Sequence, residues 1–194
     1  MSPAPRRRDA VRNRDAILRA TAAAVTREGA EALRVAEVAR AAGVGPGTIY
    51  RAFGDKRGLL LALVDEQERR LQEDLLRGPP PLGPGAAPDE RLEAFLLALQ
   101  RLVIEHRDVL AAADGASPAS PFRTATHAAW HQHLVLLLRQ RPGAAADDAD
   151  PVALADLLLA TVGAGVHQHL LDERGVSPAA AAAALRRVLR GVLG

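Results

Sequence analysis

The residues that decide the fold are 38–56, VARAAGVGPGTIYRAFGDK. Apolar residues recur at helical spacing up to Ala42, and Gly43 follows where a helix commonly ends in a left-handed residue. Pro46 then stands where a first-turn proline has no amide hydrogen bond to lose. The stretch predicts a short helix, a glycine turn, a second short helix and the start of a third, which is the outline of a helix-turn-helix.

The second short helix has two distinct faces. Ile49 and Phe53 are four residues apart and are expected to point inward. The opposite face is the one that enters the major groove of DNA in a helix-turn-helix. Asp55 is expected to cap the following helix. The outward residues are Pro46, Gly47, Thr48, Tyr50 and Arg51.

This pattern resembles the tetracycline-repressor (TetR) family of bacterial transcriptional regulators. The resemblance runs from about residue 14 to 63 and includes VAEVARAAGV (35–44), GTIYRAF (47–53) and DKRGLL (55–60). It implies an all-α fold of about nine helices. Three N-terminal helices would bind DNA, a fourth would link the domains, and a larger C-terminal helical domain would bind a ligand and form a dimer.

The chain-long pattern predicts helices and no strand. The proline- and glycine-rich segment 78–88 cannot continue a helix and is expected to form an exposed loop. We expect two domains: an N-terminal arm with the helix-turn-helix over 1–57, and the linking helix with a ligand-binding and dimerisation domain over 58–194. The expected helices cover 13–29, 35–42, 46–52, 56–77, 89–105, 107–113, 120–141, 151–173 and 178–193.

The charge is divided along the chain. The formal net charge is +2, but residues 1–57 hold twelve Lys and Arg against six Asp and Glu, while residues 58–194 hold thirteen against seventeen. The basic part coincides with the helix-turn-helix, so attraction to a polyanion is expected there. The apolar runs are interrupted before about 20 residues, and no apolar signal core is present. We expect a cytoplasmic protein, associated with the nucleoid when bound to DNA, and no membrane partner.

Among the expected DNA contacts, Arg51 is the candidate for base recognition, since a guanidinium can donate two hydrogen bonds to guanine. The alternative is that Arg51 meets only phosphate or solvent. The family pattern implies backbone contacts by Tyr50 and Thr48, and Lys56 at a helix start favours phosphate. Arg34 and Gly45 replace the usual Ser or Thr caps. The expected DNA-binding set is Arg34, Gly45, Pro46, Gly47, Thr48, Tyr50, Arg51 and Lys56.

The basic run at residues 6–8, RRR, has two interpretations. It is either an arm that reaches an adjacent minor groove, as N-terminal arms do in other helix-turn-helix proteins, or a solubilising tail.

The resemblance also implies a homodimer through the last two long helices and a small-molecule pocket between the middle helices. Core packing within one subunit is the alternative for both sets of residues. The candidate ligand-binding residues are Phe95, Leu99, Leu102, Phe122, Thr126, His127, Trp130, His131, Leu134 and Leu158.

His127 and His131 are four apart, a spacing that suits a transition metal if carboxylates join it. No HExxH motif, nucleophile–base grouping, phosphate loop or cofactor motif is present, so we expect no enzyme, no catalytic residues, no bound metal and no cofactor. The expected function is a ligand-responsive regulator, a repressor that binds a pseudo-palindromic double-stranded DNA operator as a homodimer and is released by a small molecule. The alternatives are a metal-dependent enzyme and a helical interaction module that binds no DNA.

Overall fold

The computed structural model describes residues 5–114, 125–142 and 150–193. These residues form helices α1 to α9 and no strand, so the predicted all-α class is confirmed. Contacts divide the chain into two compact units, residues 1–67 and 68–194. The helix α4 (Lys56–Arg77) begins in the first unit and ends in the second. The expected division after residue 57 stays a prediction.

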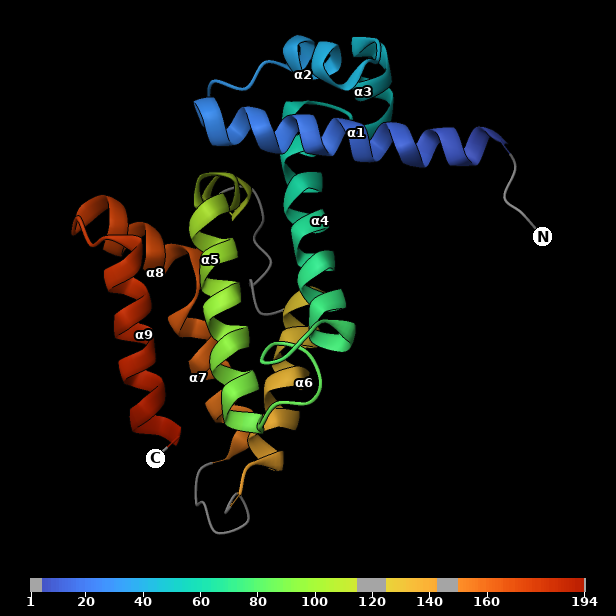
Figure 1. The fold of residues 1–194 in the computed structure, drawn as a ribbon. Helices are drawn as coiled ribbons and strands as arrows, with labels where there is room; N and C mark the ends of the chain where they lie inside the picture. The colour runs from blue at the N-terminus through green and yellow to red at the C-terminus, as the bar shows by residue number, and fades with distance from the viewer. Residues whose placement is uncertain (1–4, 115–124, 143–149, 194) are drawn as a thin grey trace. The chain divides into compact units, whose positions relative to one another are not determined.

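The first unit contains α1 (Pro5–Glu28), α2 (Val35–Ala42), α3 (Pro46–Phe53) and the first turns of α4 (Figure 1). The helix α1 packs on α2, and α2 packs on α3. The predicted start of the first helix at residue 13 is wrong. No glycine or proline interrupts 6–28, and Pro5 occupies a first-turn position that tolerates proline. The basic run 6–8 therefore belongs to a helix rather than to an extended arm.

The turn between α2 and α3 has the predicted cap. Gly43 adopts φ 69° and ψ 28°, and its N–H donates to Arg40 O. Gly45 precedes α3 in an extended conformation without a side-chain cap. At the start of α4, Asp55 Oδ1 accepts a hydrogen bond from Gly58 N at 2.7 Å, as expected of an N-cap. These caps set where α2, α3 and α4 begin and end.

The second unit contains the end of α4, α5 (Pro88–Asp114), α6 (Ala125–Gln140), α7 (Pro151–Thr161), α8 (Ala164–Gln168), a π-helical turn (His169–Glu173) and α9 (Pro178–Leu193). The helix α5 is central, because it contacts α6, α8 and α9, while α6 also packs on α7 (Figure 1). The buried stripe of α5 includes Leu92, Phe95, Leu99 and Leu102.

Two predicted helix boundaries in this unit are wrong. The segments 89–105 and 107–113 form the single helix α5, because no glycine or proline interrupts it and the buried stripe continues through His106 and Val109. The predicted helix 151–173 is instead divided at Val162 and Gly163, where Gly163 has the extended backbone of an N-cap.

The same segment, Pro151–Glu173, is long and apolar enough to cross a membrane by length and composition alone. This is weak evidence for a span, since core helices of soluble proteins pass the same test. Here Ala155, Leu158 and Leu159 are buried, and α7 packs on α6.

A buried polar network ties α5, α8 and α9 together. Gln100 Nε2 donates to Ala181 O at 3.3 Å and lies 3.0 Å from His167 Nε2. Because the amide nitrogen is a donor, His167 Nε2 accepts, and Nδ1 is the protonated nitrogen that donates to Gly163 O at 3.1 Å. One neutral tautomer of His167 therefore satisfies the network where the predicted helix is broken.

Candidate nucleic-acid interface and ligand site

The helix α3 presents one face to the core and the other to solvent. Ile49 and Phe53 are buried, as predicted, whereas Tyr50 is 52% exposed and Arg51 is also exposed. Pro46 and Gly47 share the exposed surface, while Thr48 is half-buried. A helix with this division can lay its outer side chains against the floor and walls of a DNA groove while its inner side chains hold it to the rest of the unit.

Arg14 on α1 was not predicted as part of this region. Its guanidinium lies over the Phe53 ring at 5.1 Å from the ring centre, a cation–π contact between α1 and the end of α3. Arg14 also lines a hollow of about 320 Å³ between these helices, together with Asp9, Ala10, Asn13, Ile17, Thr48 and Ala52. The two partners are far apart in the chain, so no local spacing indicated the contact.

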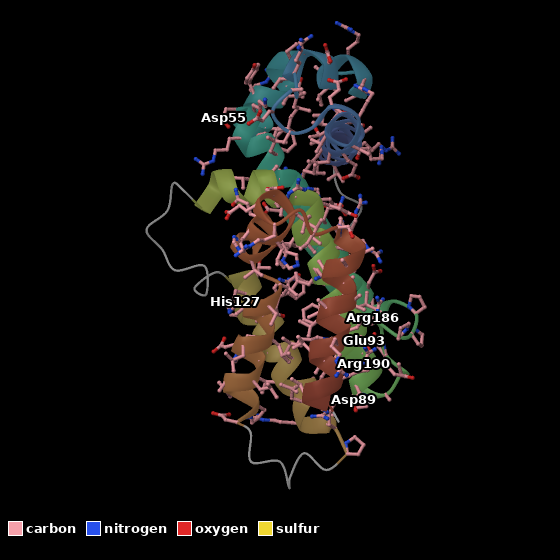
Figure 2. All side chains as sticks on the ribbon, turned by 90° about the vertical axis from the view of Figure 1, so that its left-hand side faces the viewer. Asp55, Asp89, Glu93, His127, Arg186 and Arg190 are labelled. Carbon is pink, nitrogen blue, oxygen red and sulfur yellow. The ribbon has the colours of Figure 1, made fainter. Side chains whose placement is uncertain are left out.

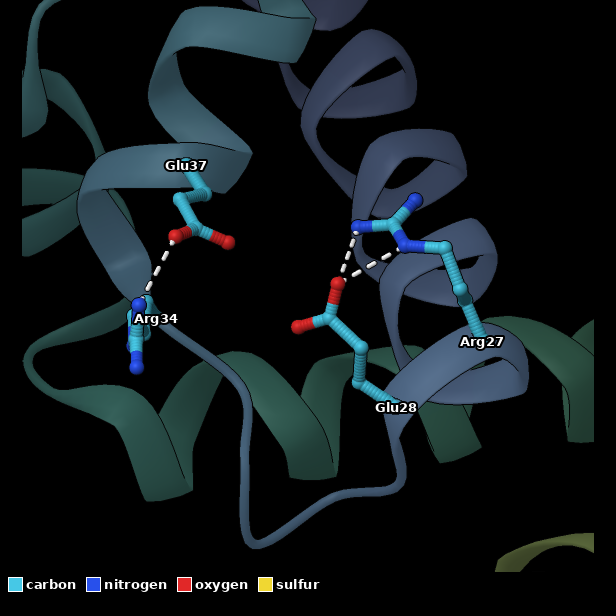
Figure 3. A network of polar contacts seen from close by, with 4 residues as sticks. All are labelled: Arg27, Glu28, Arg34 and Glu37. Carbon is cyan, nitrogen blue, oxygen red and sulfur yellow. Dashed lines mark hydrogen bonds and ion pairs between the residues drawn. The ribbon is translucent and has the colours of Figure 1, made fainter.

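Two of the predicted DNA-binding residues, Lys56 and Arg34, already have partners within the protein. Lys56 Nζ donates to Glu31 O at 2.5 Å, which holds the loop before α2 against the start of α4. Arg34 lies 3.3 Å from Glu37, beside a second pair in which Arg27 contacts Glu28 (Figure 3). Exposed ion pairs of this kind contribute at most about 1 kcal/mol. A phosphate could therefore replace Glu37 as the partner of Arg34 at small cost.

The predicted ligand-binding residues are largely buried between α5, α6 and α7. The Phe95 and Trp130 rings are 5.4 Å apart and tilted by 45°. Thr126, His127 and His131 are half-buried on α6. Phe122 lies outside the described residues. The fully or nearly buried members are Phe95, Leu99, Leu102, Trp130, Leu134 and Leu158.

His133 on α6 was not predicted. Its ring meets Phe95 edge-on at 5.2 Å. Burial, and secondarily the positive charge of Arg91, lower the pKa of His133 to about 4, so the imidazole is neutral at pH 7. The ring also lines a surface groove of about 570 Å³ with His131, Gln132, Val135, Leu136, Arg139 and Val152. This groove shares only His131 with the predicted set.

The two histidines four apart share a carboxylate. Asp156 Oδ1 on α7 lies 3.7 Å from His127 Nε2 and 3.6 Å from His131 Nε2, and His131 Nε2 also lies 3.2 Å from Val152 O. Within residues 5–114, 125–142 and 150–193, however, no group of three ligating side chains is placed to hold a metal ion. The arrangement links α6 to α7.

The first unit is basic and exposes the second helix of a helix-turn-helix, and α4 joins it to a helical domain. This is the architecture of a DNA-binding regulator whose two domains are on one chain. The model of bacterial regulatory proteins of the tetR family matches residues 17–63. A putative TetR-family transcriptional regulator from Rhodococcus sp. is 29% identical, with 95% of this chain and 100% of that chain covered and a TM-score of 0.65. Over residues 17–63 the chain therefore matches the tetR family of regulators, and over nearly its whole length it is similar to the Rhodococcus structure.

Two further structures share the fold. A putative transcriptional regulator from Saccharomonospora viridis in complex with choline is 21% identical, covering 91% of this chain and 95% of that one, with a TM-score of 0.65. FadR from Bacillus subtilis in complex with stearoyl-CoA is 18% identical, covering 90% and 96%, with a TM-score of 0.56. A comparison with curated proteins found no match. Regulators of this family bind DNA and small-molecule effectors, typically as dimers.

Proposed function

We propose that the chain is a repressor that binds a pseudo-palindromic operator as a homodimer and is released by a small molecule. The observation that carries the proposal is the match of residues 17–63 to the family, on a unit whose α3 exposes Tyr50 and Arg51. We place this function in the cytoplasm, at the nucleoid when DNA is bound.

In this proposal α3 lies in the major groove and Arg51 reads a base. Tyr50, Thr48 and the backbone of residues 45–47 meet the flanking phosphates, where contacts position the protein without reading sequence. Arg34 exchanges Glu37 for a phosphate. Lys56 acts through the positive charge that it brings to the first turn of α4 while its amine holds Glu31 O.

Selection from a library of random duplexes tests DNA recognition whatever the sequence of the operator. We expect enrichment of an inverted repeat whose half-sites are about 34–36 Å apart or a multiple of that spacing. Binding of the selected duplex should fall steeply as salt is raised, because released counterions contribute to the affinity. A library without an enriched motif, or binding equal to that of scrambled duplex, would contradict sequence-specific recognition.

The proposed dimer surface lies on α7, α8 and α9. Leu157 is 66% exposed, and Val166 and Val188 are each more than two-fifths exposed. Exposed large apolar side chains on consecutive elements favour an interaction surface. A two-fold pairing through these helices would cover them and place two reading helices on one operator. Molar mass measured by light scattering at micromolar concentration tests the pairing, and a monomer would contradict it.

The proposed effector site lies between the middle helices, where Phe95, Trp130 and Leu134 are packed. Choline and stearoyl-CoA are held by the two structures of the same fold, which supports a small-molecule effector as a class. An effector releases DNA only if it binds the two conformations of the repressor with different affinity. Release of the selected duplex by a cytoplasmic metabolite extract, abolished by removing small molecules from it, tests this part.

A further inference from the structure

Among the described residues, several buried polar atoms on α5 and α6 lack a hydrogen-bond partner. Two of them are Arg91 Nε and His133 Nε2, and each has less than 1 Å² of exposed surface. Buried donors and acceptors in folded proteins are nearly always paired, so each exception calls for a missing ion, water or ligand. His106 Nδ1, further along α5, is a third such atom.

Arg91 is a charged group that no acidic side chain of the described residues neutralises. Its Nη2 donates to Leu75 O on the last turns of α4 at 3.3 Å, which satisfies one edge of the guanidinium but brings no negative charge. A partly buried cation without an anion is costly, because a carbonyl oxygen replaces only part of the hydration that the charged group has lost. The Nε edge of Arg91 is therefore the position at which an acceptor is missing.

The carboxylates near the start of α5 are engaged elsewhere. Asp89 pairs with Arg141 at 2.7 Å, Glu90 accepts from Ala87 N at 3.2 Å, and Glu93 pairs with Arg186 on α9 at 3.3 Å. Figure 2 shows Glu93 and Arg186 on neighbouring helices. Within the part of the chain that the structure describes, none of these acids neutralises Arg91.

Phe95 relates His133 to Arg91, because it contacts His133 and shares a helix face with Arg91. Arg91 and Phe95 are four residues apart on α5, so their side chains lie on the same face of the helix, and the His133 ring meets Phe95 at 5.2 Å. The positive charge of Arg91 is, after burial, the second cause that lowers the pKa of the His133 imidazole. A neutral imidazole can still donate from Nε2. Arg91 Nε and His133 Nε2 are then two donors, one of them on a charged group, that both lack an acceptor.

We propose that Arg91 and His133 bind an oxyanion, the carboxylate or phosphate group of a small organic effector, with its apolar part against Phe95 and Trp130. This inference rests on the proposed effector site and names its chemical class. A charged guanidinium binds an oxyanion through short, strong hydrogen bonds. Phe95 and Trp130 are in ring contact and, with Leu134, are buried apolar side chains of α5 and α6.

The same contact couples the ligand to α4. Arg91 already holds Leu75 O, and α4 begins directly after the turn that follows α3. An anion that draws the guanidinium towards itself competes with Leu75 O for the same side chain. Ligand binding and the position of the end of α4 are therefore linked through one residue, as effector control requires.

The experiment uses the full chain without DNA and its single tryptophan, Trp130. Fluorescence is titrated with straight-chain carboxylates from acetate to laurate, with alcohols and amines of the same lengths, with alkyl phosphates and with inorganic phosphate. We expect saturable binding of carboxylates or alkyl phosphates that strengthens with chain length, and at least tenfold weaker binding of the alcohols and amines. The two anion series show which oxyanion the site prefers. Alcohols that bind as tightly as the anions, or no saturable anion binding, would overturn the proposal.

Variants separate the two donors from the general charge of the protein. We expect Arg91→Gln and His133→Phe each to weaken anion binding about tenfold or more. Arg101→Gln removes an exposed arginine from the same helix and should leave the affinity unchanged. Should Arg91→Gln fail to fold, Arg91→Lys keeps the charge but lacks Nε, and the same loss is expected. Unchanged anion affinity in His133→Phe and either Arg91 variant would refute the assignment.

DNA binding is measured separately on the same preparations. A protein that selects an operator but binds no oxyanion contradicts only this inference. A protein that binds the oxyanion but selects no operator contradicts the proposed repressor.

Discussion

At the scale of single residues, the interface combines side chains that are free to meet DNA with others that are already engaged. Arg51 and Tyr50 are exposed on α3, whereas Lys56 holds Glu31 O and Arg34 lies against Glu37. Gly45 has no hydroxyl with which to bond a phosphate. In the proposed function, sequence readout by α3 is therefore concentrated in Arg51, and the surrounding residues position the helix.

Replacing Arg51 with alanine is expected to relax base preference. A bidentate arginine–guanine pair contributes about 1–3 kcal/mol of discrimination against the wrong base. The measurement is the affinity for a panel of single-base operator variants. At one position of each half-site, the wild type should distinguish the bases, whereas Arg51→Ala should bind them with equal affinity. Arg40→Ala, which removes an exposed arginine from α2, is the charge-matched control and should keep the preference at every position. A wild-type pattern in Arg51→Ala would show that Arg51 meets only phosphate or solvent.

His133 predicts how stability depends on pH. Its pKa is about 4 in the folded state, against an ordinary value of 6.5, so the unfolded chain binds more protons between these values. Stability should be constant above about pH 6.5 with respect to this group and should fall as the pH drops towards 4. Burial also lowers the pKa of His106, so it contributes in the same direction. His133→Phe should therefore show a smaller fall in Tm from about pH 6.5 to about pH 4.5 than the wild type, and an equal fall would contradict the shift.

At the scale of elements, local signals in the sequence determine most of the first unit. Gly43, Pro46 and Asp55 mark ends and starts that the structure confirms, because each acts through the conformation or hydrogen bonds of its own neighbourhood.

The division of the predicted helix 151–173 coincides with a contact between distant segments. Gln100 on α5 bonds His167, and His167 in turn bonds Gly163, where the helix is broken. The residue spacing within 151–173 does not indicate a hydrogen bond to a residue on α5, so the sequence predicted one continuous helix.

The same reason limits what the sequence could predict of the sites. The inward and outward faces of α3 follow from a helical period, so Ile49 and Phe53 were correctly placed. Arg14 over Phe53 and Arg91 beside His133 join residues on different helices, and only the packed structure brings them together. The roles of the predicted DNA- and ligand-binding residues stay predictions.

The glycine turn gives a test of the motif's stability. Gly43 has φ 69°, and a Cβ there would meet no atom within 4 Å, so Gly43→Ala costs only the strain of the left-handed backbone. We expect a loss of about 1 kcal/mol in the free energy of unfolding. Gly47→Ala is the matched control: it lies within α3 with open space around it, and should stabilise the protein by about 0.5–1 kcal/mol. Chemical denaturation measures both, and a loss in Gly47→Ala equal to that in Gly43→Ala would contradict the role of the turn.

At the scale of the whole molecule, function requires that a ligand in one unit alter DNA binding by the other. The helix α4 provides chain continuity between them, and the Arg91–Leu75 hydrogen bond places the proposed oxyanion next to its end. Two copies are needed for an inverted repeat, so pairing through α7, α8 and α9 would set the separation of the reading helices. Under the proposed function, operator affinity would therefore depend on the dimer as well as on α3.

Disrupting the proposed dimer should weaken operator binding without touching the DNA-binding unit. Leu157 lies on α7 and is 66% exposed. Leu157→Asp places a carboxylate there, which is costly to bury in a dimer interface but is tolerated when it is exposed in a monomer. We expect a monomeric mass at micromolar concentration, an unchanged helical content, and operator affinity reduced to that of a single half-site. Leu76→Asp is the control, since Leu76 is 69% exposed on α4 and lies outside the last helices. If both variants remain dimers with wild-type affinity, the pairing surface lies elsewhere; if both become monomers, the loss is not specific to α7.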